Sequence, residues 1–511
     1  MMKYIKIFII SISPLFLGGC TENNIDFEPI SQITTDQVTS SLELLENTIV
    51  GNYAFLSSAE GKYGYDRTRY DVTEYMSDDV ILNQWSGNDF SYSLTYQPTS
   101  ASDRSLDFWQ YSYRAIYSIN VANEGLDNLE GLSSEDEIKR DQLKGENIFL
   151  RSMFYFDLVR VYGRPYSHDD PATNLGVPLS DTSTDNEGLS RATVKETYEF
   201  IEKDLLEAAT LLNEEKSNIY VSKEVALAGL SRLYLFKEEN DKAIVYADSV
   251  INSGRYQLLS SEAFPRYNRN APVGNSETIF AVQRLATDNV GRYMMGGMMH
   301  GDGGYGQIMV SSSFMDLLFK NPNDLRVNFI DVQYELDAEG NKIPDPDNEY
   351  YGYKVIEKSS IPEYWTQKLT YQDDEPMLHS PIYFRLAEMY LIKAEAYAKN
   401  GEEEKALEMV NIIRERAGLS GDQLFRLDNL QGYGSVLDIV LDEARLEFAH
   451  EGHRTHDVFR NKKTMDRSYM TWQGWSGPGS IPYTSNRILH QIPEAEMLKN
   501  DNLVQNPSYT N

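Results

Sequence analysis

The sequence predicts a mostly α-helical protein whose helices form a tetratricopeptide-type repeat. Apolar residues recur at helical spacing along much of the chain, beginning with one long helix expected over residues 33–59. Two later segments, 226–244 and 391–407, look like copies of one helix pair, since each has small residues in its first helix, a turn, and an alanine that opens the second helix. Such a pair buries its apolar face only by stacking on neighbours, so about three units are needed for a continuous core.

The expected scaffold is divided into three blocks by two loop-rich stretches. The blocks are residues 33–59, 106–254 and 381–460, and the helices expected after the first block lie over 108–123, 134–162, 193–212, 222–237, 241–254, 381–400, 403–417 and 435–451. Ser134 and Glu137 have the spacing of a capping box at a helix start. The stretches 60–105 and 262–380 are rich in turn-forming residues and lack helical periodicity, which predicts long loops with a few short strands.

Charge and cysteine content exclude several classes of function. The chain of 511 residues has 47 basic and 78 acidic residues and a formal net charge of −31. Nucleic acid and anionic membrane surfaces are therefore poor partners. The single cysteine, Cys20, excludes a disulfide framework and a cysteine-rich metal cluster. The 35 tyrosines, 20 phenylalanines and 5 tryptophans fill cores or form sugar-binding and protein-binding surfaces.

The first twenty residues have the pattern of a bacterial lipoprotein signal. Two lysines form a basic region, and the apolar run 7–17 is shorter than the ~20 residues that span a bilayer. The sequence Leu-Gly-Gly-Cys that ends at Cys20 is typical of a lipobox, so we expect residues 1–19 to be a cleaved signal peptide and Cys20 to carry lipid. The mature chain then has a tether over 20–32 and a single folded body over 33–511. The alternative is an ordinary secretory signal in which the cysteine is incidental.

Five segments also match the sequence blocks of a known family. The first, residues 144–166, reads KGENIFLRSMFYFDLVRVYGRPY, and the others follow in the family's order at 190–212, 382–419, 441–460 and 489–509. Together with the lipobox, they resemble the SusD/RagB family of glycan-binding outer-membrane lipoproteins. Ala444 and Ser508 stand where the family usually has Arg and Gly, and residues 60–105 and 285–380 fall in regions that vary across the family.

This resemblance implies a binding protein without catalytic activity. Members of the family lie on the outer face of the Gram-negative outer membrane, where they capture oligosaccharide or polysaccharide for a partner SusC-like TonB-dependent transporter. The resemblance also implies about four helix pairs that pack on the transporter, and loops on the opposite side that carry an aromatic glycan platform. It implies no cofactor, and it places the protein at the cell surface, held by its lipid.

The stretch 60–105 has the composition of a carbohydrate site. Sugars are bound by flat aromatic faces together with planar polar groups that reach the hydroxyls. Trp85 is the leading candidate, because its setting lacks helical or strand periodicity and related proteins use a tryptophan in this stretch; the alternative is a plug that anchors the loop. The other candidates are Asn83, Tyr65, Arg69, Tyr92 and Tyr96 in the same stretch, and Tyr293 in the glycine-rich loop 291–306.

Three patterns that resemble other kinds of site are better explained without a ligand. The three histidines between residues 450 and 456 sweep around a helix instead of sharing one face, so no metal is expected there. Residues 301–306 have the glycine spacing of a dinucleotide-binding turn, but no strand precedes them and no clear helix follows. The acidic run 345–349 is followed by Tyr350 where a calcium-binding EF-hand loop needs glycine, which favours a solvated loop.

The charge of the chain also bears on the ligand. A strong negative charge favours a neutral glycan over an acidic one, although a local basic patch of Arg67, Arg69 and Arg104 would reverse this preference. Two other functions stay open: a structural lid for the transporter with no glycan affinity, and a glycoside hydrolase. Hydrolysis requires two carboxylates ~5–10 Å apart beside a cleft. The sugar, its linkage and the chain length are not predicted.

Overall fold

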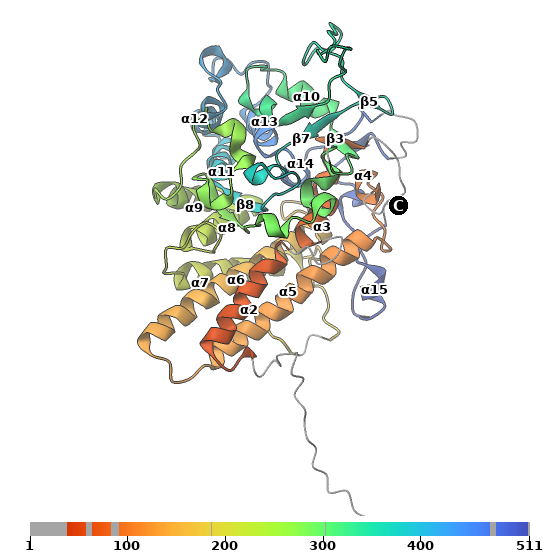
Figure 1. Ribbon diagram of the computed structural model, residues 1–511. Coiled ribbons are helices and arrows are strands. Elements are labelled where there is room, and N and C mark those ends of the chain that lie inside the picture. Colours follow the sequence, from red (N-terminus) through yellow and green to blue (C-terminus); the bar gives the residue numbers. More distant parts are fainter. Residues whose placement is uncertain are drawn as a thin grey trace, which may run out of the picture.

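The long helices lie side by side in sequence order and form one continuous stack (Figure 1). The computed structural model describes residues 38–57, 64–82, 91–184, 187–301, 303–470 and 477–508. Within these ranges, none of the helices combines the length and the apolar character that crossing a bilayer requires. The expected signal peptide, the lipidation site Cys20 and the tether lie outside the described residues.

The stack consists of successive helix pairs. These are α2 (Leu42–Phe55) with α5 (Asp103–Asn128), α6 (Ser134–Tyr162) with α7 (Val194–Leu211), α8 (Lys223–Phe236) with α9 (Asn240–Asn252), and α11 (Leu386–Lys399) with α12 (Glu403–Arg416). Each pair packs on the next, and α13 (Val436–Phe448) packs on α11 and α12 and also contacts α14 (Arg454–Arg460). The predicted fold class, a mostly helical scaffold of tetratricopeptide type, is confirmed.

Two of the helix pairs turn in the same way, as their sequence similarity suggests. Glu238 between α8 and α9 has φ 60°, and Gly401 between α11 and α12 has φ 78°. The backbone hydrogen bonds correspond residue by residue: Lys237, Glu238 and Glu239 donate to Leu233, Leu235 and Tyr234, and Asn400, Gly401 and Glu402 donate to Ala396, Ala398 and Tyr397. Ala243 and Ala406, which open the second helices, are both fully buried.

The start of α6 differs by one residue from the prediction. Ser133, and not Ser134, is the N-cap, and its hydroxyl accepts a hydrogen bond from the backbone N–H of Asp136 at 3.2 Å. A complete capping box occurs instead at α7, where Thr193 and Glu196 each accept a hydrogen bond from the other's backbone N–H. Because two serines precede a run of three acidic residues, the spacing alone did not separate the two positions.

Short antiparallel strand pairs occupy the side of the molecule opposite the lower end of α2 and α6. They pair β1 (Val80–Leu82) with β3 (Ile308–Val310), β2 (Thr278–Ala281) with β8 (Ile382–Arg385), β4 (Ile330–Val332) with β7 (Tyr364–Thr366), β5 (Glu357–Lys358) with β6 (Ile361–Pro362), and β9 (Met465–Asp466) with β10 (Ser480–Ile481). The short helices α4 (Ser91–Leu94), α10 (Ser312–Leu318) and α15 (Glu494–Met497) complete the described elements of α-helix and strand, apart from α3.

Helix α3 (Tyr65–Val72) lies within a stretch expected to be loop. Its sequence, YDRTRYDV, is mostly polar and therefore lacks an apolar stripe, yet all eight residues are buried. The charges are compensated inside the protein: Arg69 pairs with Asp157 at 3.0 Å and Asp66 with Arg284 at 3.0 Å. A polar helix that is buried through ion pairs is invisible to a search for hydrophobic periodicity.

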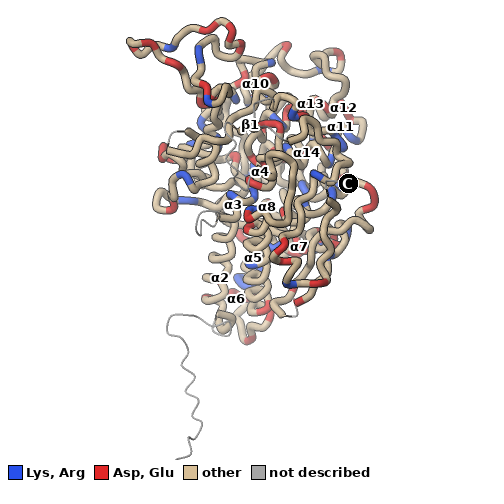
Figure 2. The backbone as a smooth tube through the Cα atoms, turned by 90° about the vertical axis from the view of Figure 1, so that its right-hand side faces the viewer, with Lys and Arg blue, Asp and Glu red and all other residues tan. Residues whose placement is uncertain are grey.

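Residues 333–357 form an arm that projects from the body. Isolated bridges hold it together, joining Tyr334 with Val355, Leu336 with Lys342, and Pro344 with Tyr353. The arm extends at the top of Figures 1 and 2, at the end of the molecule away from α2 and α6, and acidic residues are frequent along it. We call residues 333–357 the arm below.

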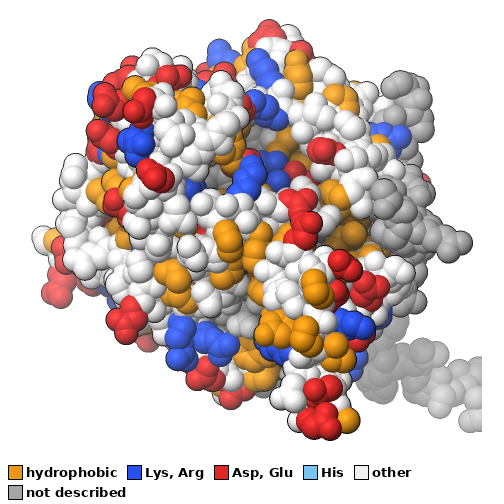
Figure 3. All heavy atoms as spheres, turned by 90° about the horizontal axis from the view of Figure 1, so that it is seen from above, with side chains coloured by type: hydrophobic (Ala, Val, Ile, Leu, Met, Phe, Trp, Pro, Cys, Tyr) orange, Lys and Arg blue, Asp and Glu red, His pale blue; other side chains and the backbone are white. Residues whose placement is uncertain are grey.

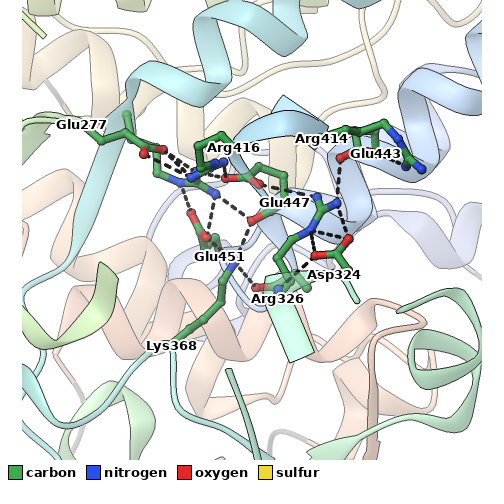
Figure 4. Close-up of polar contacts among 11 residues, drawn as sticks. Glu277, Asp324, Arg326, Lys368, Arg414, Arg416, Glu443, Glu447 and Glu451 are labelled. Atoms are coloured by element: carbon green, nitrogen blue, oxygen red, sulfur yellow. Dashed lines mark hydrogen bonds and ion pairs between the residues drawn. The ribbon is translucent and has the colours of Figure 1, made fainter. Parts of the chain in front are cut away.

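A network of buried charges joins the helical stack to the strand pairs (Figure 4). Five cationic side chains contact five carboxylates, namely Arg326, Arg385, Arg414, Arg416 and Lys368 with Glu277, Asp324, Glu443, Glu447 and Glu451. They come from α12 and α13, from the ends of β2 and β8, and from the segments beside β4 and β7. We call these ten residues the charge network.

Arg385 and Glu447 lie at the centre of the charge network. Arg385 pairs with Glu447, with Glu451 at 2.8 Å and with Glu277 at 3.1 Å. Arg416 contacts Glu447 at 2.5 Å and Glu277 at 3.1 Å. Burial alone would raise the pKa of Glu447, but the guanidinium groups around it outweigh burial and hold this pKa well below its usual value. Glu447 therefore stays ionised at neutral pH, and its ion pairs join α13 to α12 and to the end of β8.

Candidate functional site

Tyr65, a predicted glycan contact, lies in the core. Its exposed fraction is 0%, and its ring stacks on Phe108 with 5.5 Å between centroids and meets Phe154 edge-on at 4.9 Å. The hydroxyl donates a hydrogen bond to Asp157 Oδ2 at 2.6 Å. A ring enclosed on these sides has no face for a sugar, so the expectation is corrected: Tyr65 is a packing residue.

Arg69 and Tyr96 are corrected in the same way. The Nε of Arg69 lies 3.0 Å from Asp157 Oδ2, and both side chains are buried. Burial alone would raise the pKa of Asp157, but Arg69 and Arg160 lower it to about 2, so the ion pair persists at neutral pH. Tyr96 is fully buried, donates its hydroxyl hydrogen to the Met76 carbonyl, and packs edge-on against Phe459. Both residues therefore contribute to packing: Arg69 through its ion pair with Asp157, and Tyr96 through its contacts with Met76 and Phe459.

The remaining predicted residues are at the surface or outside the described chain. Tyr92 in α4 is 40% exposed. Tyr293 is half-buried and lies edge-on to Tyr305, with 6.3 Å between centroids. Asn83 and Trp85 follow β1 directly in sequence but lie outside the described residues.

The glycine-rich loop that carries Tyr293 is anchored by methionines. Met294, Met295, Met298 and Met299 are all buried, three of them in a core that contains Trp365. Gly301 lies directly against Trp365, so that a Cβ at this position would overlap the indole ring. The guanidinium of Arg67 donates to the Tyr293 carbonyl at 3.3 Å. The anchoring leaves Tyr305, 36% exposed, beside Tyr293 as an aromatic pair at the surface.

A cleft of about 960 Å³ opens between the arm and the strand pairs. Its lining includes three tyrosines from separate segments: Tyr350 from the arm, Tyr364 from β7 and Tyr469 from the region after β9. Ile81 of β1 and Val310 of β3 lie at its base. The surface seen from above carries acidic, basic and apolar side chains interspersed (Figure 3). The volume is in the range that small-molecule ligands occupy.

The tyrosines of the cleft are held in place by neighbours. Tyr350 and Tyr364 meet edge-on with 6.1 Å between centroids. The Tyr350 hydroxyl donates to Asp316 at 2.5 Å, the Tyr469 hydroxyl donates to the Val80 carbonyl at 2.8 Å, and Asn348 donates to the Tyr364 hydroxyl at 3.1 Å. Burial raises the pKa of the Tyr364 hydroxyl, so the ring stays neutral. Tyr364 is only 5% exposed, whereas Tyr350 and Tyr469 are half-buried, so the latter two rings present surface to the cleft.

The cleft is strongly acidic. Among the described residues, five carboxylates and one lysine, Lys354, line it; the acids are Glu335, Asp345, Asp347, Glu349 and Glu357. Asn348, Ser312 and Ser360 add neutral polar groups. An anionic ligand would be repelled by this lining, whereas a neutral polyhydroxylated ligand would find hydrogen-bond acceptors beside aromatic faces.

The sequence analysis missed the cleft tyrosines. The signal was present, since Tyr350, Tyr351 and Tyr353 follow Asn348 in a segment without periodicity, which is the pattern that pointed to Trp85. Through its acidic residues, the same segment partly matches a calcium-binding loop instead. The structure shows no group of His, Cys, Asp and Glu side chains suited to hold a metal ion among the residues it describes.

The stacked helix pairs and the loop-side cleft define a helical-repeat binding protein. Two family descriptions match it: "Starch-binding associating with outer membrane" over residues 25–235, and "SusD family" over residues 328–509. The chain belongs to the SusD/RagB family.

Relatives match along their full lengths. The chain is 25% identical to SusD-like protein P2 of Formosa agariphila, with both chains covered completely, and 24% identical to the starch-binding protein SusD of Bacteroides thetaiotaomicron, with 99% of each covered. The crystal structure of a putative sugar binding protein from Bacteroides vulgatus has 28% identity and a TM-score of 0.76, covering 92% of this chain and 98% of that one. A SusD superfamily structure from Bacteroides thetaiotaomicron has a TM-score of 0.77 at 26% identity, covering 91% and 100%.

Proposed function

We propose that this protein is a cell-surface lipoprotein that binds a neutral glycan in the tyrosine cleft and delivers it to a SusC-like TonB-dependent transporter. The observation that carries the proposal is the cleft itself, where the half-buried rings of Tyr350 and Tyr469 lie beside an acidic, hydrogen-bonding lining. The names of relatives support the ligand class, since one of them is a starch-binding protein. Trp85, Asn83, Tyr92 and Tyr293 remain proposed contacts.

A neutral ligand follows from the charge of the cleft. Each anionic sugar would meet an excess of carboxylates, and Lys354 alone does not compensate for five of them. A neutral chain is not repelled by these carboxylates and gains contact with the half-buried rings of Tyr350 and Tyr469, whereas Tyr364, 5% exposed, lies below the surface. Alginate, pectin and sulfated glycans are therefore disfavoured.

Affinity electrophoresis of residues 21–511 tests the proposal. The gel panel contains amylopectin, galactomannan and xylan as neutral polysaccharides, and alginate and pectin as acidic ones. At least one neutral polysaccharide should retard the protein and the acidic ones should not. Retardation only by acidic polysaccharides, or by none of the panel, would contradict the proposal.

Three variants then locate the site. Tyr350→Ala removes a lining ring and should weaken binding by about 0.5–1.5 kcal/mol. Tyr353→Ala is the matched control, because Tyr353 is also on the arm and 39% exposed but does not line the cleft. Trp85→Ala tests the ring predicted from the sequence, and a loss of similar size is expected.

Two rival functions give different results in the same assays. A structural lid without glycan affinity would not be retarded by any polysaccharide, even by one that the purified transporter binds. A glycoside hydrolase would release reducing ends from the polysaccharide that retards it, and we expect none. The lipid anchor is tested separately: Cys20→Ala should move the protein from the membrane fraction to the soluble fraction.

A further inference from the structure

A second concave surface lies on the scaffold, away from the cleft. It is a groove of about 1050 Å³ between α5 and residues 178–180, 187–189 and 496–503. The groove and the cleft share no lining residue. In Figure 1, α5 and α15 lie in the lower part of the molecule, whereas the arm projects at the top.

An aromatic row follows the groove along α5. Trp109, Tyr113 and Tyr117 are four residues apart, which places them on one face of the helix at steps of about 6 Å. Trp109 is nearly buried and its ring lies 4.9 Å from that of Tyr113. Exposure then increases along the row, because Tyr113 is half-buried and Tyr117 is 52% exposed. The row therefore begins in the core and ends as an open ring face.

The walls of the groove are tied to α5 by hydrogen bonds. Tyr113 donates its hydroxyl hydrogen to the Pro178 carbonyl at 2.9 Å, and Gln110 donates to Glu496 Oε1 at 2.8 Å. Asn500 donates to the Leu189 carbonyl at 2.9 Å, which joins two of these segments to each other. The groove is thus formed before any ligand arrives, and binding in it needs little reordering of the chain.

The lining chemistry fits a neutral polyhydroxylated ligand. Among the described residues that line it, two are charged with each sign, Arg114 and Lys499 against Glu187 and Glu496, so this lining selects neither a polyanion nor a polycation. Amide, guanidinium and carboxylate groups border the aromatic row, which is the combination that sugar rings and their hydroxyls require. A purely apolar ligand would leave these polar groups without partners.

We infer that the groove on α5 is a second glycan-binding site, which takes a segment of a neutral glycan chain along Tyr113 and Tyr117, with Trp109 packed beneath them. The ligand class rests on the proposed function, but the site does not depend on the cleft. A protein with two separate sites binds a long chain more tightly than a short one, because the second contact is intramolecular.

The test compares groove and cleft variants of residues 21–511 by affinity electrophoresis in the neutral polysaccharide that retards the wild type. Tyr117→Ala should reduce the affinity about three- to tenfold, and Tyr117→Phe, which keeps the ring, should retain it. Tyr220→Ala is the control, since Tyr220 is 39% exposed and lines neither the groove nor the cleft. Equal unfolding midpoints for all variants exclude misfolding as the cause.

The outcomes separate this inference from the proposed function. If Tyr117→Ala weakens binding and Tyr350→Ala does not, the groove binds glycan and the cleft proposal fails. If Tyr350→Ala weakens binding and Tyr117→Ala leaves the affinity unchanged, the cleft stands and the groove inference is overturned. If both weaken it, the double variant should lose more than either. If no neutral polysaccharide retards the wild type, both ideas are contradicted.

Discussion

The charge network and the cleft use the same kinds of side chain in opposite ways. In the network, five carboxylates are matched by five cations, and the members at its centre are almost completely buried. In the cleft, five carboxylates face one lysine at the surface. A buried charge needs an oppositely charged partner because an unpaired ion in the interior lowers the stability of the fold. A solvated charge needs no such partner and can attract or repel a ligand.

The comparison separates residues that hold the fold from residues that meet a partner. The blocks that resemble the SusD/RagB family supply Arg385, Arg414, Arg416, Glu443, Glu447 and Glu451 of the network. All the described residues that line the cleft lie outside these blocks.

The largest expected effect comes from breaking the network. Arg385→Met leaves Glu447 and Glu451 buried with fewer partners, and we expect the free energy of unfolding to fall by about 3–5 kcal/mol. Urea denaturation followed by circular dichroism measures the change. Lys242→Met is the control, because its pair with Glu239 is largely exposed and its loss should cost less than ~1 kcal/mol. Equal losses of stability in the two variants would contradict the expectation that the buried ion pairs contribute more to stability than the exposed pair.

Acid should destabilise the protein through the same buried groups. The folded-state pKa values of Glu447 and Glu451 lie below the unfolded value of about 4.3, so their contribution is present above that pH and is lost as the pH falls below it. Burial also lowers the pKa of His379 to about 3 and of His490 to about 4. The unfolded chain then takes up protons near pH 6.5 while the folded chain does not, and stability declines from there.

Unfolding titrations from pH 8 to pH 3 measure this decline. Each additional proton bound by the unfolded state contributes about 1.4 kcal/mol per pH unit. Glu447→Gln should be less stable at pH 7 and should show a shallower decline below pH 4.3 than the wild type. A stability that is flat from pH 7 to pH 4 would contradict the assignment of these groups.

Neutralising the cleft should have the smallest effect and leave the fold unchanged. Asp347→Asn with Glu349→Gln removes two exposed charges, so stability should change by less than ~0.5 kcal/mol. Binding of the neutral polysaccharide should also persist, while retardation by pectin should increase. Retardation by pectin that stays at the wild-type level would show that the acidic lining does not select the ligand.

The helical stack could be predicted because its signal is local. The pairs α8–α9 and α11–α12 carry buried apolar positions at helical spacing, and their turns repeat the same backbone bonds. Helix α3 was missed because its buried face is polar and compensated by Asp157 and Arg284, which lie far away in the sequence. Hydrophobic periodicity reveals a helix only when one face is apolar and buried and the other is polar and exposed. In α3 all eight residues are buried and most of them are polar, so the helix lacks this pattern.

The site was only partly predictable for the same reason. Tyr65, Arg69 and Tyr96 have the composition of a sugar site, but partners from distant segments bury them. The cleft tyrosines at 350, 364 and 469 meet only because the arm, β7 and the region after β9 converge in space. The spacing of residues in the sequence does not show that these segments converge. The high content of aromatic and acidic residues in the chain, by contrast, can be read directly from the sequence.

The most direct test of the account measures affinity and stability on the same two proteins. Tyr350→Ala should lose about 0.5–1.5 kcal/mol of affinity for the neutral polysaccharide and about 1 kcal/mol or less of stability. Arg385→Met should lose several kcal/mol of stability and, under conditions where it is folded, keep its affinity. Unchanged affinity in Tyr350→Ala, with both variants differing from the wild type only in stability, would contradict the assignment of the cleft as the glycan site.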